Sequence, residues 1–306
     1  MIVIGILAHN KPACIADTVA SIRRYVEQPA IILFNGGADT SLNALANKLG
    51  LEYCRYSRPL YHDGRFNSQF ARGQNGRHKL LEFPLGLMRH LRHANHNYEF
   101  LVTIESDMLI IREGLEIFLR REMVDSYYMG TNFHFLGDRP GWEIGRYFLH
   151  HWSKWKPLLG DIRPAGCFNP GQVFRREFVN RLLDFPLLNE ILSLARVSRL
   201  PALDEILYAT LAVALDANPR CNPGSSGLTM SVYDSRQLHS FMKDQSVFLL
   251  HKVCMDVNSP DRAFLRAIRN GAVPTEFDIV RPRAGKWSRS IRSVIKSLYY
   301  ETVVRA

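Results

Sequence analysis

The sequence predicts an α/β protein built on a mostly parallel sheet, and three observations support this. Short apolar segments at residues 2–8, 30–34 and 51–56 have the length and the β-branched composition of buried strands. Segments with apolar residues at helical spacing, 13–26 and 42–50, lie between them, and Gly50 is a typical helix end. Strands that alternate with helices pair in parallel, because each helix returns the chain to the same end of the sheet.

The remaining elements are expected in the following order. Residues 57–77 are polar and rich in Gly and Arg, which indicates a long loop. A helix interrupted by a proline is expected at 78–94, a strand at 100–104, a helix at 113–122 and a strand at 126–133. Residues 134–166 are expected to form an irregular insert. A strand and a helix are expected at 167–185, a buried apolar helix at 200–217 and a late strand at 245–256.

The composition is that of an ordinary globular protein, with 306 residues, 46% of them hydrophobic and 22% charged. No apolar run reaches the roughly 18 to 20 residues that span a bilayer, and the start "MIVIGILAHNKPA" is interpreted as a first core strand and not as a signal peptide. The five cysteines are scattered and never have CxxC spacing, which argues against a zinc site and against a disulfide framework. The simplest setting is a reducing cytoplasm.

The chain is basic, with a formal net charge of +10. Such an excess fits nucleic acid, an anionic membrane surface or a phosphate-rich small substrate. Because the sequence contains no RNP motif, zinc finger or helix-turn-helix signature, nucleic acid is the weakest of the three, and no nucleic-acid partner is expected.

The segment "YEFLVTIESDMLIIRE" (98–113) places Glu105 and Asp107 between two apolar stretches. A buried charge is costly unless it is paired. Two carboxylates at the end of a strand can hold Mn²⁺ or Mg²⁺ beside a diphosphate, which suits a nucleotide-sugar transferase. The alternative is a surface turn with a capping aspartate.

Two further groups carry candidate chemistry. Asp204 and Glu205 lie in the first turn of the predicted apolar helix and either interact with its dipole or supply a general base. His251 and Lys252 end the late strand. The lysine could neutralise a leaving diphosphate and a neutral histidine could bind a metal; the alternative is a half-buried histidine beside a solvated lysine.

Polar residues follow the first two predicted strands. His9 and Asn10 follow the first strand, and Asn35 and Gly36 follow the second. Ligands of parallel sheets bind at the carboxyl ends of the strands, so these residues are expected to line a ligand site.

The C-terminal segment, residues 271–306, is basic and amphipathic. Apolar residues recur at helical spacing between arginines and lysines. This pattern fits a helix on an anionic membrane surface and equally a helix docked on the domain.

The segments "AHNKP", "LVTIESDMLI", "FNPGQVFRREFV", "LDEILYATL" and "SVFLLHKV" occur in the order found in GT-A fold glycosyltransferases. Over about residues 1–270 the chain most resembles the core-2/I-branching β-1,6-N-acetylglucosaminyltransferases and the peptide O-xylosyltransferases. The "DExLxxTL" pattern is the most specific match, whereas the first strand and helix are shared with many nucleotide-sugar transferases. The chain departs from the family where "ALDE" replaces "PDE" and "LLHK" replaces "FARK".

The resemblance implies an inverting hexosyl- or pentosyltransferase that moves a sugar from a nucleotide-diphosphate sugar, usually a UDP-sugar, to a hydroxyl of a glycan or glycolipid acceptor. It implies a nucleotide-binding half at 1–110, an acceptor-binding half at 111–270 and a single GT-A domain followed by the tail. Polysaccharide biosynthesis at the inner, cytoplasmic face of a membrane is the setting that these features favour.

The resemblance also assigns roles to residues. It implies that Glu205 is the catalytic base, helped by Asp204, and that Lys252 stabilises the negative charge of the diphosphate. The nucleotide-sugar site is expected to comprise His9, Asn10, Asn35, Gly36, Arg77, Lys79, Glu105, Asp107 and Lys252. Asp107 with His251 would bind Mn²⁺ or Mg²⁺ in a metal-using enzyme, whereas the family's lysine replaces the metal, so the cofactor is either none or one of these ions.

Two alternatives to a transferase remain. One is a GT-A-like nucleotidyltransferase, although "GILAHNKPA" lacks the Gly-rich loop typical of such enzymes. The other is a non-catalytic carbohydrate-binding or scaffold protein on a degenerate transferase fold.

Overall fold

The structure is a computed structural model that describes residues 1–37, 39–55, 61–62, 65–66, 81–198, 200, 202–229 and 233–272. The predicted loop at 57–77 lies outside the described residues apart from two short paired strands, β4 (Tyr61–His62) and β5 (Arg65–Phe66). Arg77, Lys79 and all but the first two residues of the tail at 271–306 also lie outside them.

The main sheet has seven strands in the order β10-β8-β9-β6-β1-β2-β3. Strand β9 is antiparallel to both of its neighbours, and the other neighbouring pairs are parallel. The prediction of a mostly parallel α/β sheet is therefore confirmed. The strands are β1 (Ile2–Ala8), β2 (Ala30–Asn35), β3 (Glu52–Arg55), β6 (Phe100–Glu105), β8 (Tyr128–Phe135), β9 (Ala165–Arg175) and β10 (Arg220–Cys221).

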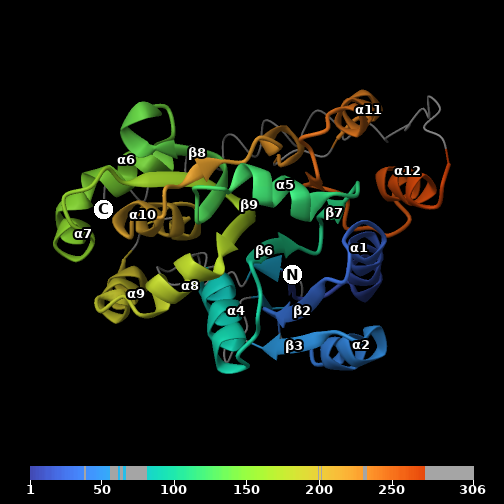
Figure 1. The fold of residues 1–306 in the computed structure, drawn as a ribbon, viewed down its shortest axis with the longest axis horizontal. Helices are drawn as coiled ribbons and strands as arrows, with labels where there is room; N and C mark the ends of the chain where they lie inside the picture. The colour runs from blue at the N-terminus through green and yellow to red at the C-terminus, as the bar shows by residue number, and fades with distance from the viewer. Residues whose placement is uncertain are drawn as a thin grey trace.

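Helices cover both faces of this sheet (Figure 1). One face is covered by α1 (Pro12–Tyr25), α2 (Ser41–Leu49) and α5 (Leu115–Glu122), and the other by α4 (Glu82–His93), α7 (Trp152–Leu159), α8 (Arg176–Leu183), α9 (Leu188–Val197) and α10 (Leu207–Ala214). Figure 1 shows α6 (Glu143–His150), α7 and α9 at one end of the molecule and α1, α2 and α12 (Pro260–Arg269) at the other.

Alternation along β1 explains the two layers. Ile4 and Ile6 point to the face of α1 and α5, whereas Val3 and Leu7 point to the face of α4 and α8. All four are buried, and complete burial of such a side chain contributes about 1.5–3 kcal/mol.

The glycine in β1 sets the distance to α4. A Cβ at Gly5 would lie 2.1 Å from the Cδ1 atom of Leu87, so only glycine lets α4 pack this closely on the sheet.

A third apolar cluster lies beside the sheet. Strand β7 (Leu109–Ile110) pairs antiparallel with β11 (Leu249–Leu250), and α11 (Ser235–Lys243) and α12 pack on them. The late strand predicted at 245–256 therefore contains only a two-residue strand, followed by a single bridge from His251 to Leu228, and does not join the main sheet. Its residues complete a small subsheet because their partners in β7 have already left the main sheet.

Three other predictions need correction. Residues 134–166 are not irregular, because they contain α6 and α7 after a 3₁₀ turn at Leu136–Asp138. Pro84 does not interrupt α4, since it lies in the first turn, where no intrahelical hydrogen bond needs its N–H. The helix predicted at 200–217 is preceded by a 3₁₀ turn, Leu203–Glu205, so Asp204 and Glu205 lie before α10 and not in its first turn.

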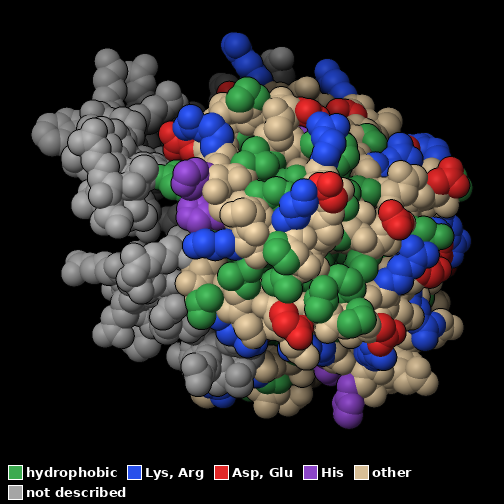
Figure 2. Space-filling view, turned by 90° about the vertical axis from the view of Figure 1, so that its left-hand side faces the viewer, with side chains coloured by type: hydrophobic (Ala, Val, Ile, Leu, Met, Phe, Trp, Pro, Cys, Tyr) green, Lys and Arg blue, Asp and Glu red, His purple; other side chains and the backbone are tan. Residues whose placement is uncertain are grey.

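Basic and acidic side chains are interspersed on the face shown in Figure 2, with hydrophobic side chains between them. Among the described residues on that face, the positive charge is thus not gathered into one patch. Among the described helices, none combines the length and the apolar composition needed to cross a bilayer.

Candidate metal and ligand site

The two carboxylates of the "ESD" segment lie where the chain leaves the main sheet. Glu105 is the last residue of β6, and a tight turn in which the Met108 N–H donates to the Glu105 carbonyl at 3.0 Å leads into β7. Glu105 is half-buried, and the side chain of Asp107 is only 8% exposed. The apolar residues on both sides are those of β6 and β7, so two separate strands explain the two apolar runs.

The pairing of β7 with β11 brings His251 and Lys252 to Asp107. Leu109 faces Leu250 in this antiparallel pair, so the residues before β7 lie beside those after β11. The Nε2 atom of His251 lies 3.6 Å from Asp107 Oδ1, and the Nζ atom of Lys252 lies 3.5 Å from Asp107 Oδ2.

The ring of His251 is held in one orientation. Its Nδ1 atom lies 2.6 Å from the Thr229 carbonyl, which can only accept, so Nδ1 carries the hydrogen and donates. In the neutral ring, Nε2 then presents its lone pair toward Asp107. Burial lowers the pKa of His251, against the opposing effect of Asp107, and favours this neutral form.

Charge and burial act together on Glu105. Burial, the negative charge of Asp107 and, to a lesser degree, that of Asp204 raise the pKa of Glu105 to about 8, although Lys252 opposes them. Lys252 only partly opposes these effects, and a bound cation would favour the ionised form of Glu105.

The ligand atoms of Glu105, Asp107 and His251 all lie within 4.8 Å of one another. The buried Oδ1 atom of Asp107 makes no hydrogen bond to any described residue. Two carboxylates and one imidazole whose Nδ1 donates to a carbonyl form a donor set suited to a divalent first-row ion such as Mn²⁺. The residues thus fit the metal that the sequence leaves open.

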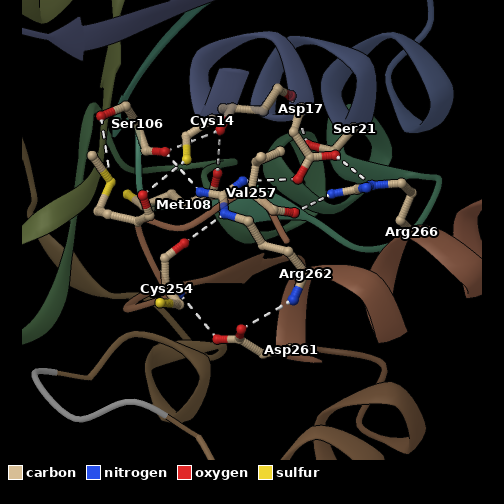
Figure 3. Close-up of polar contacts among 12 residues, drawn as sticks. Cys14, Asp17, Ser21, Ser106, Met108, Cys254, Val257, Asp261, Arg262 and Arg266 are labelled. Carbon is tan, nitrogen blue, oxygen red and sulfur yellow. Dashed lines mark hydrogen bonds and ion pairs between the residues drawn. The ribbon is translucent and has the colours of Figure 1, made fainter. Parts of the chain in front are cut away.

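An arginine from α12 fixes the backbone of this site (Figure 3). The side chain of Arg262 is fully buried and donates to the Ser106 carbonyl at 2.9 Å and to the Cys254 carbonyl at 2.6 Å. It also pairs with Asp17 of α1, at 2.8 Å. Ser106 separates the two carboxylates and Cys254 follows Lys252 closely, so one guanidinium joins the two segments that carry the site.

Asp17 also contacts two more arginines of α12. Arg269 donates to its carboxylate at 2.8 Å, and Arg266 Nε lies 3.5 Å from it. Burial alone would raise the pKa of Asp17, but the hydrogen bonds from Arg269 and Arg262 outweigh it and hold that pKa below its ordinary value.

The predicted residues at the ends of β1 and β2 lie in different surroundings. Burial lowers the pKa of His9, and the charge of Asp107 opposes this, so His9 is close enough to feel that carboxylate. Asn10 has a buried Oδ1 atom without a hydrogen bond to a described residue. Asn35 is fully buried, and its amide binds Asp39, Tyr53 and the Gly37 N–H. Asn35 therefore shapes its own loop, which also carries Gly36, whose N–H donates to the Ala8 carbonyl.

A pocket of about 780 Å³ opens next to the Glu105–Asp107–His251 group. Its described lining residues are Asn132, His134, Arg139, Gly141, Trp142, Cys167, Phe168, Glu205, Ser225, Ser226, Leu228 and Thr229. Phe168 packs against the His251 ring at 5.5 Å between centroids, so the pocket and the proposed metal ligands are adjacent.

Asp204 and Glu205 also lie at this site. Glu205 lines it, and Asp204, which is buried, is near enough to Glu105 to affect its pKa. The 3₁₀ turn before α10 thus brings both predicted carboxylates to the site.

Several residues of the site were not predicted from the sequence. These are Arg262, Asp17, Thr229 and Phe168. Arginines at 262, 266 and 269 recur on one helical face, and this spacing was a sequence signal for a buried acidic partner. No sequence signal marks Thr229, because it contributes only a backbone carbonyl.

Comparisons with known proteins give distant structural likenesses. No protein-family model matches the sequence, and no curated protein sequence matches it. The galactosyltransferase LgtC, solved with donor and acceptor sugar analogs, is similar with a TM-score of 0.44 and 11% identity over 90% of this chain and 98% of that one. Core-mannan synthase A from Aspergillus fumigatus, in an Mn/GDP form, gives 0.41 and 12% over 72% of each chain.

A third likeness is partial. TarS from S. aureus is similar with a TM-score of 0.28 and 14% identity over 42% of this chain, which corresponds to 21% of TarS. At these levels the likeness does not carry an activity over to this chain, and the side chains of the site have to support one.

Proposed function

We propose that this protein is a metal-assisted glycosyltransferase that moves a sugar from a nucleotide-diphosphate sugar to an acceptor hydroxyl. The observation that carries the proposal is the convergence of Glu105, Asp107 and His251 at the end of a parallel strand, with Lys252 beside them. Carboxyl ends of parallel strands are where α/β sheets bind nucleotides. Two structural neighbours, a galactosyltransferase with donor and acceptor sugar analogs and a core-mannan synthase in an Mn/GDP form, are consistent with it.

The three ligands would hold Mn²⁺ or Mg²⁺ against the diphosphate. When bound, the ion would neutralise negative charge that grows on the departing diphosphate. The chain's own contribution is to hold the ligands: Thr229 orients His251, and Arg262 holds the backbone on both sides. Lys252 adds a second positive charge at the same place, and Arg77 or Lys79 would assist it.

The nucleotide is proposed to lie along the ends of β1 and β2. Asn10 offers an amide oxygen without a partner among the described residues, and His9 lies near Asp107. The Asn35 side chain accepts a hydrogen bond from the Gly37 N–H. Gly37 packs close to His9, since a Cβ on Gly37 would lie 2.5 Å from the His9 carbonyl oxygen. The nucleoside is proposed to lie against this backbone.

The acceptor is proposed to enter the pocket lined by Glu205. Glu205 would take the proton of the attacking hydroxyl, and the buried Asp204 behind it would help to position the group. Attack at the anomeric carbon from the face opposite the diphosphate gives inversion. We further propose that the donor is a UDP-sugar, that the acceptor is a glycan or glycolipid, and that the chain is related to the core-2/I-branching enzymes. The proposal also includes a nucleotide-binding half up to residue 110, an acceptor-binding half after it and a tail that faces a membrane.

Donor hydrolysis tests the proposal without knowledge of the acceptor. Release of nucleoside diphosphate would be followed with UDP-, GDP- and dTDP-sugars in the presence of Mn²⁺. For the preferred donor, Glu205→Gln should lower kcat about 100-fold or more, because a general base typically contributes 10²- to 10⁴-fold. The dissociation constant for the nucleoside diphosphate should stay within about twofold of the unsubstituted protein, since Glu205 does not lie among the proposed ligands.

Glu190→Gln serves as the matched control, because Glu190 is exposed on α9 and should leave turnover unchanged. A scaffold protein would show no turnover with any donor. A nucleotidyltransferase would instead make a nucleotide-sugar from a nucleoside triphosphate and a sugar 1-phosphate. Either result, or full activity of Glu205→Gln, would refute the proposal.

A further inference from the structure

Three potential metal ligands converge at the edge strand of the sheet, away from the site described above. Glu52 is the first residue of β3, His90 lies in the last turn of α4 and His96 follows that helix. The Nε2 atoms of both histidines lie 3.0 Å from the same Glu52 oxygen, Oε2. All three ligand atoms lie within 4.8 Å of one another.

The backbone places the two histidines side by side. Asn95 takes a left-handed conformation, with φ of 51°, and the His96 N–H donates to the Leu91 carbonyl at 3.0 Å. This turn folds His96 back beside the last turn of α4, and the fully buried Leu91 anchors that turn in the core. Glu52 is fixed independently, by the pairing of β3 with β2.

We propose that Glu52, His90 and His96 form a second metal site that takes Zn²⁺ or a similar imidazole-preferring ion. Adjacent ligands around a tetrahedral ion with bonds of about 2.0–2.1 Å lie about 3.3 Å apart, close to the observed spacing. Two imidazoles and one carboxylate favour Zn²⁺ over Mg²⁺, whereas the Glu105–Asp107–His251 group has the opposite balance.

The surroundings admit an ion and a water ligand. The three side chains are 39%, 30% and 21% exposed for Glu52, His90 and His96. No lysine or arginine among the described residues forms an ion pair with Glu52, so its two partners shown here are both histidines. The charge of Glu52 is also felt by Cys54 on the same strand, where burial and then Glu52 raise the thiol pKa to about 12.

The two sites are separate. Strand β3 lies three strands from β6, so the sites are about 14 Å or more apart at about 4.8 Å per strand. A metal at Glu52 would join the edge strand to α4 and would not touch the proposed diphosphate position. The competing interpretation is a metal-free hydrogen-bonded group in which both histidines donate to the carboxylate.

Equilibrium dialysis with Zn²⁺ distinguishes these interpretations. It would use the full chain carrying Asp107→Asn, which weakens the first site. We expect one saturable Zn²⁺ per chain, and an at least tenfold weaker affinity when His96→Ala or Glu52→Gln is added, since even the loss of an outer-shell partner of a metal ligand typically costs 10- to 100-fold. His93→Ala is the control, because His93 is exposed on the same helix and should change nothing.

Folding is checked by thermal unfolding in chelator. Each variant's Zn²⁺-induced rise in Tm is compared with its own metal-free value, so a loss of stability alone cannot mimic a loss of binding. The proposal is refuted if the Asp107→Asn chain shows no saturable Zn²⁺ binding. It is equally refuted if Glu52→Gln and His96→Ala bind Zn²⁺ as tightly as His93→Ala does.

Discussion

At the scale of single residues, Glu105 and Asp107 differ although only Ser106 separates them. Asp107 has His251 and Lys252 within 3.6 Å, whereas Glu105 has its pKa raised to about 8 by burial and by the charges of Asp107 and Asp204. The pair therefore combines one paired carboxylate with one that resists ionisation. A cation that ionises Glu105 on binding releases a proton, so metal binding should strengthen as pH rises.

The same shift predicts how stability depends on pH. The folded state holds the Glu105 proton more tightly than the unfolded chain, so this carboxyl favours folding at low pH. That advantage is lost as pH rises from its ordinary pKa, 4.5, to about 8. In metal-free buffer, the Tm of Glu105→Gln minus that of the unsubstituted protein should therefore increase between pH 5 and pH 8.5.

Glu143→Gln provides the baseline, because Glu143 is 51% exposed. Its Tm should follow that of the unsubstituted protein across the range. If the Glu105→Gln profile runs parallel to both, Glu105 ionises as an ordinary surface carboxyl does.

At the scale of elements, α12 links the segments that carry the site. Arg262 joins α12 to α1 through Asp17, to the turn after β6 through Ser106 and to the segment after β11 through Cys254. An apolar side chain could not replace this role, because the Cys254 carbonyl would lose its hydrogen bond from Arg262 and the Ser106 carbonyl would keep the longer one, at 3.3 Å, from the Thr18 hydroxyl. The helix thus positions ligands that it does not itself contain.

Removal of the guanidinium should cost both stability and metal affinity. Arg262→Met is expected to lower the free energy of unfolding by about 3 kcal/mol, at the low end for a broken buried ion pair because Arg269 still neutralises Asp17. Arg24→Met removes an exposed ion pair from α1 and should cost less than about 1 kcal/mol. Urea unfolding measures both.

Mn²⁺ affinity separates a positioning role from a purely structural one. At a temperature where both variants are folded, Arg262→Met should bind Mn²⁺ more weakly, and Arg24→Met should bind it as the unsubstituted protein does. Equal affinities would mean that the segments at 106 and 254 keep their places without Arg262.

At the scale of the whole molecule, the alternation of apolar strands and helices was sufficient to predict the sheet. Residues 2–8 and 100–105 are buried on both faces, and such continuous apolar runs are typical of central strands in a parallel sheet. The short pair β7–β11 was harder to predict, because two-residue strands have no period and depend on a partner about 140 residues away. The helices α6 and α7 were missed because Gly145 lies within α6 and Pro157 within α7, and both residue types disfavour a helix.

The site was predictable to a similar degree. Acidic and basic residues at strand ends could be recognised singly, and the structure brings Glu105, Asp107, His251 and Lys252 together. The Asp17–Arg262 pair and the Glu52–His90–His96 group join residues that no local pattern connects. The argument against zinc from cysteine spacing could not detect the latter, because that group contains no cysteine.

The central claim is that Glu105, Asp107 and His251 hold a divalent ion that takes part in nucleotide binding. Thermal unfolding with UDP, GDP, CMP and dTDP, each with and without Mn²⁺, tests it most directly. A ligand at 100 times its dissociation constant stabilises the native state by about 2.7 kcal/mol. We expect one nucleotide to raise the Tm only with Mn²⁺, and Asp107→Asn to abolish the rise. A rise that is the same without Mn²⁺, or that persists in Asp107→Asn, would contradict the claim.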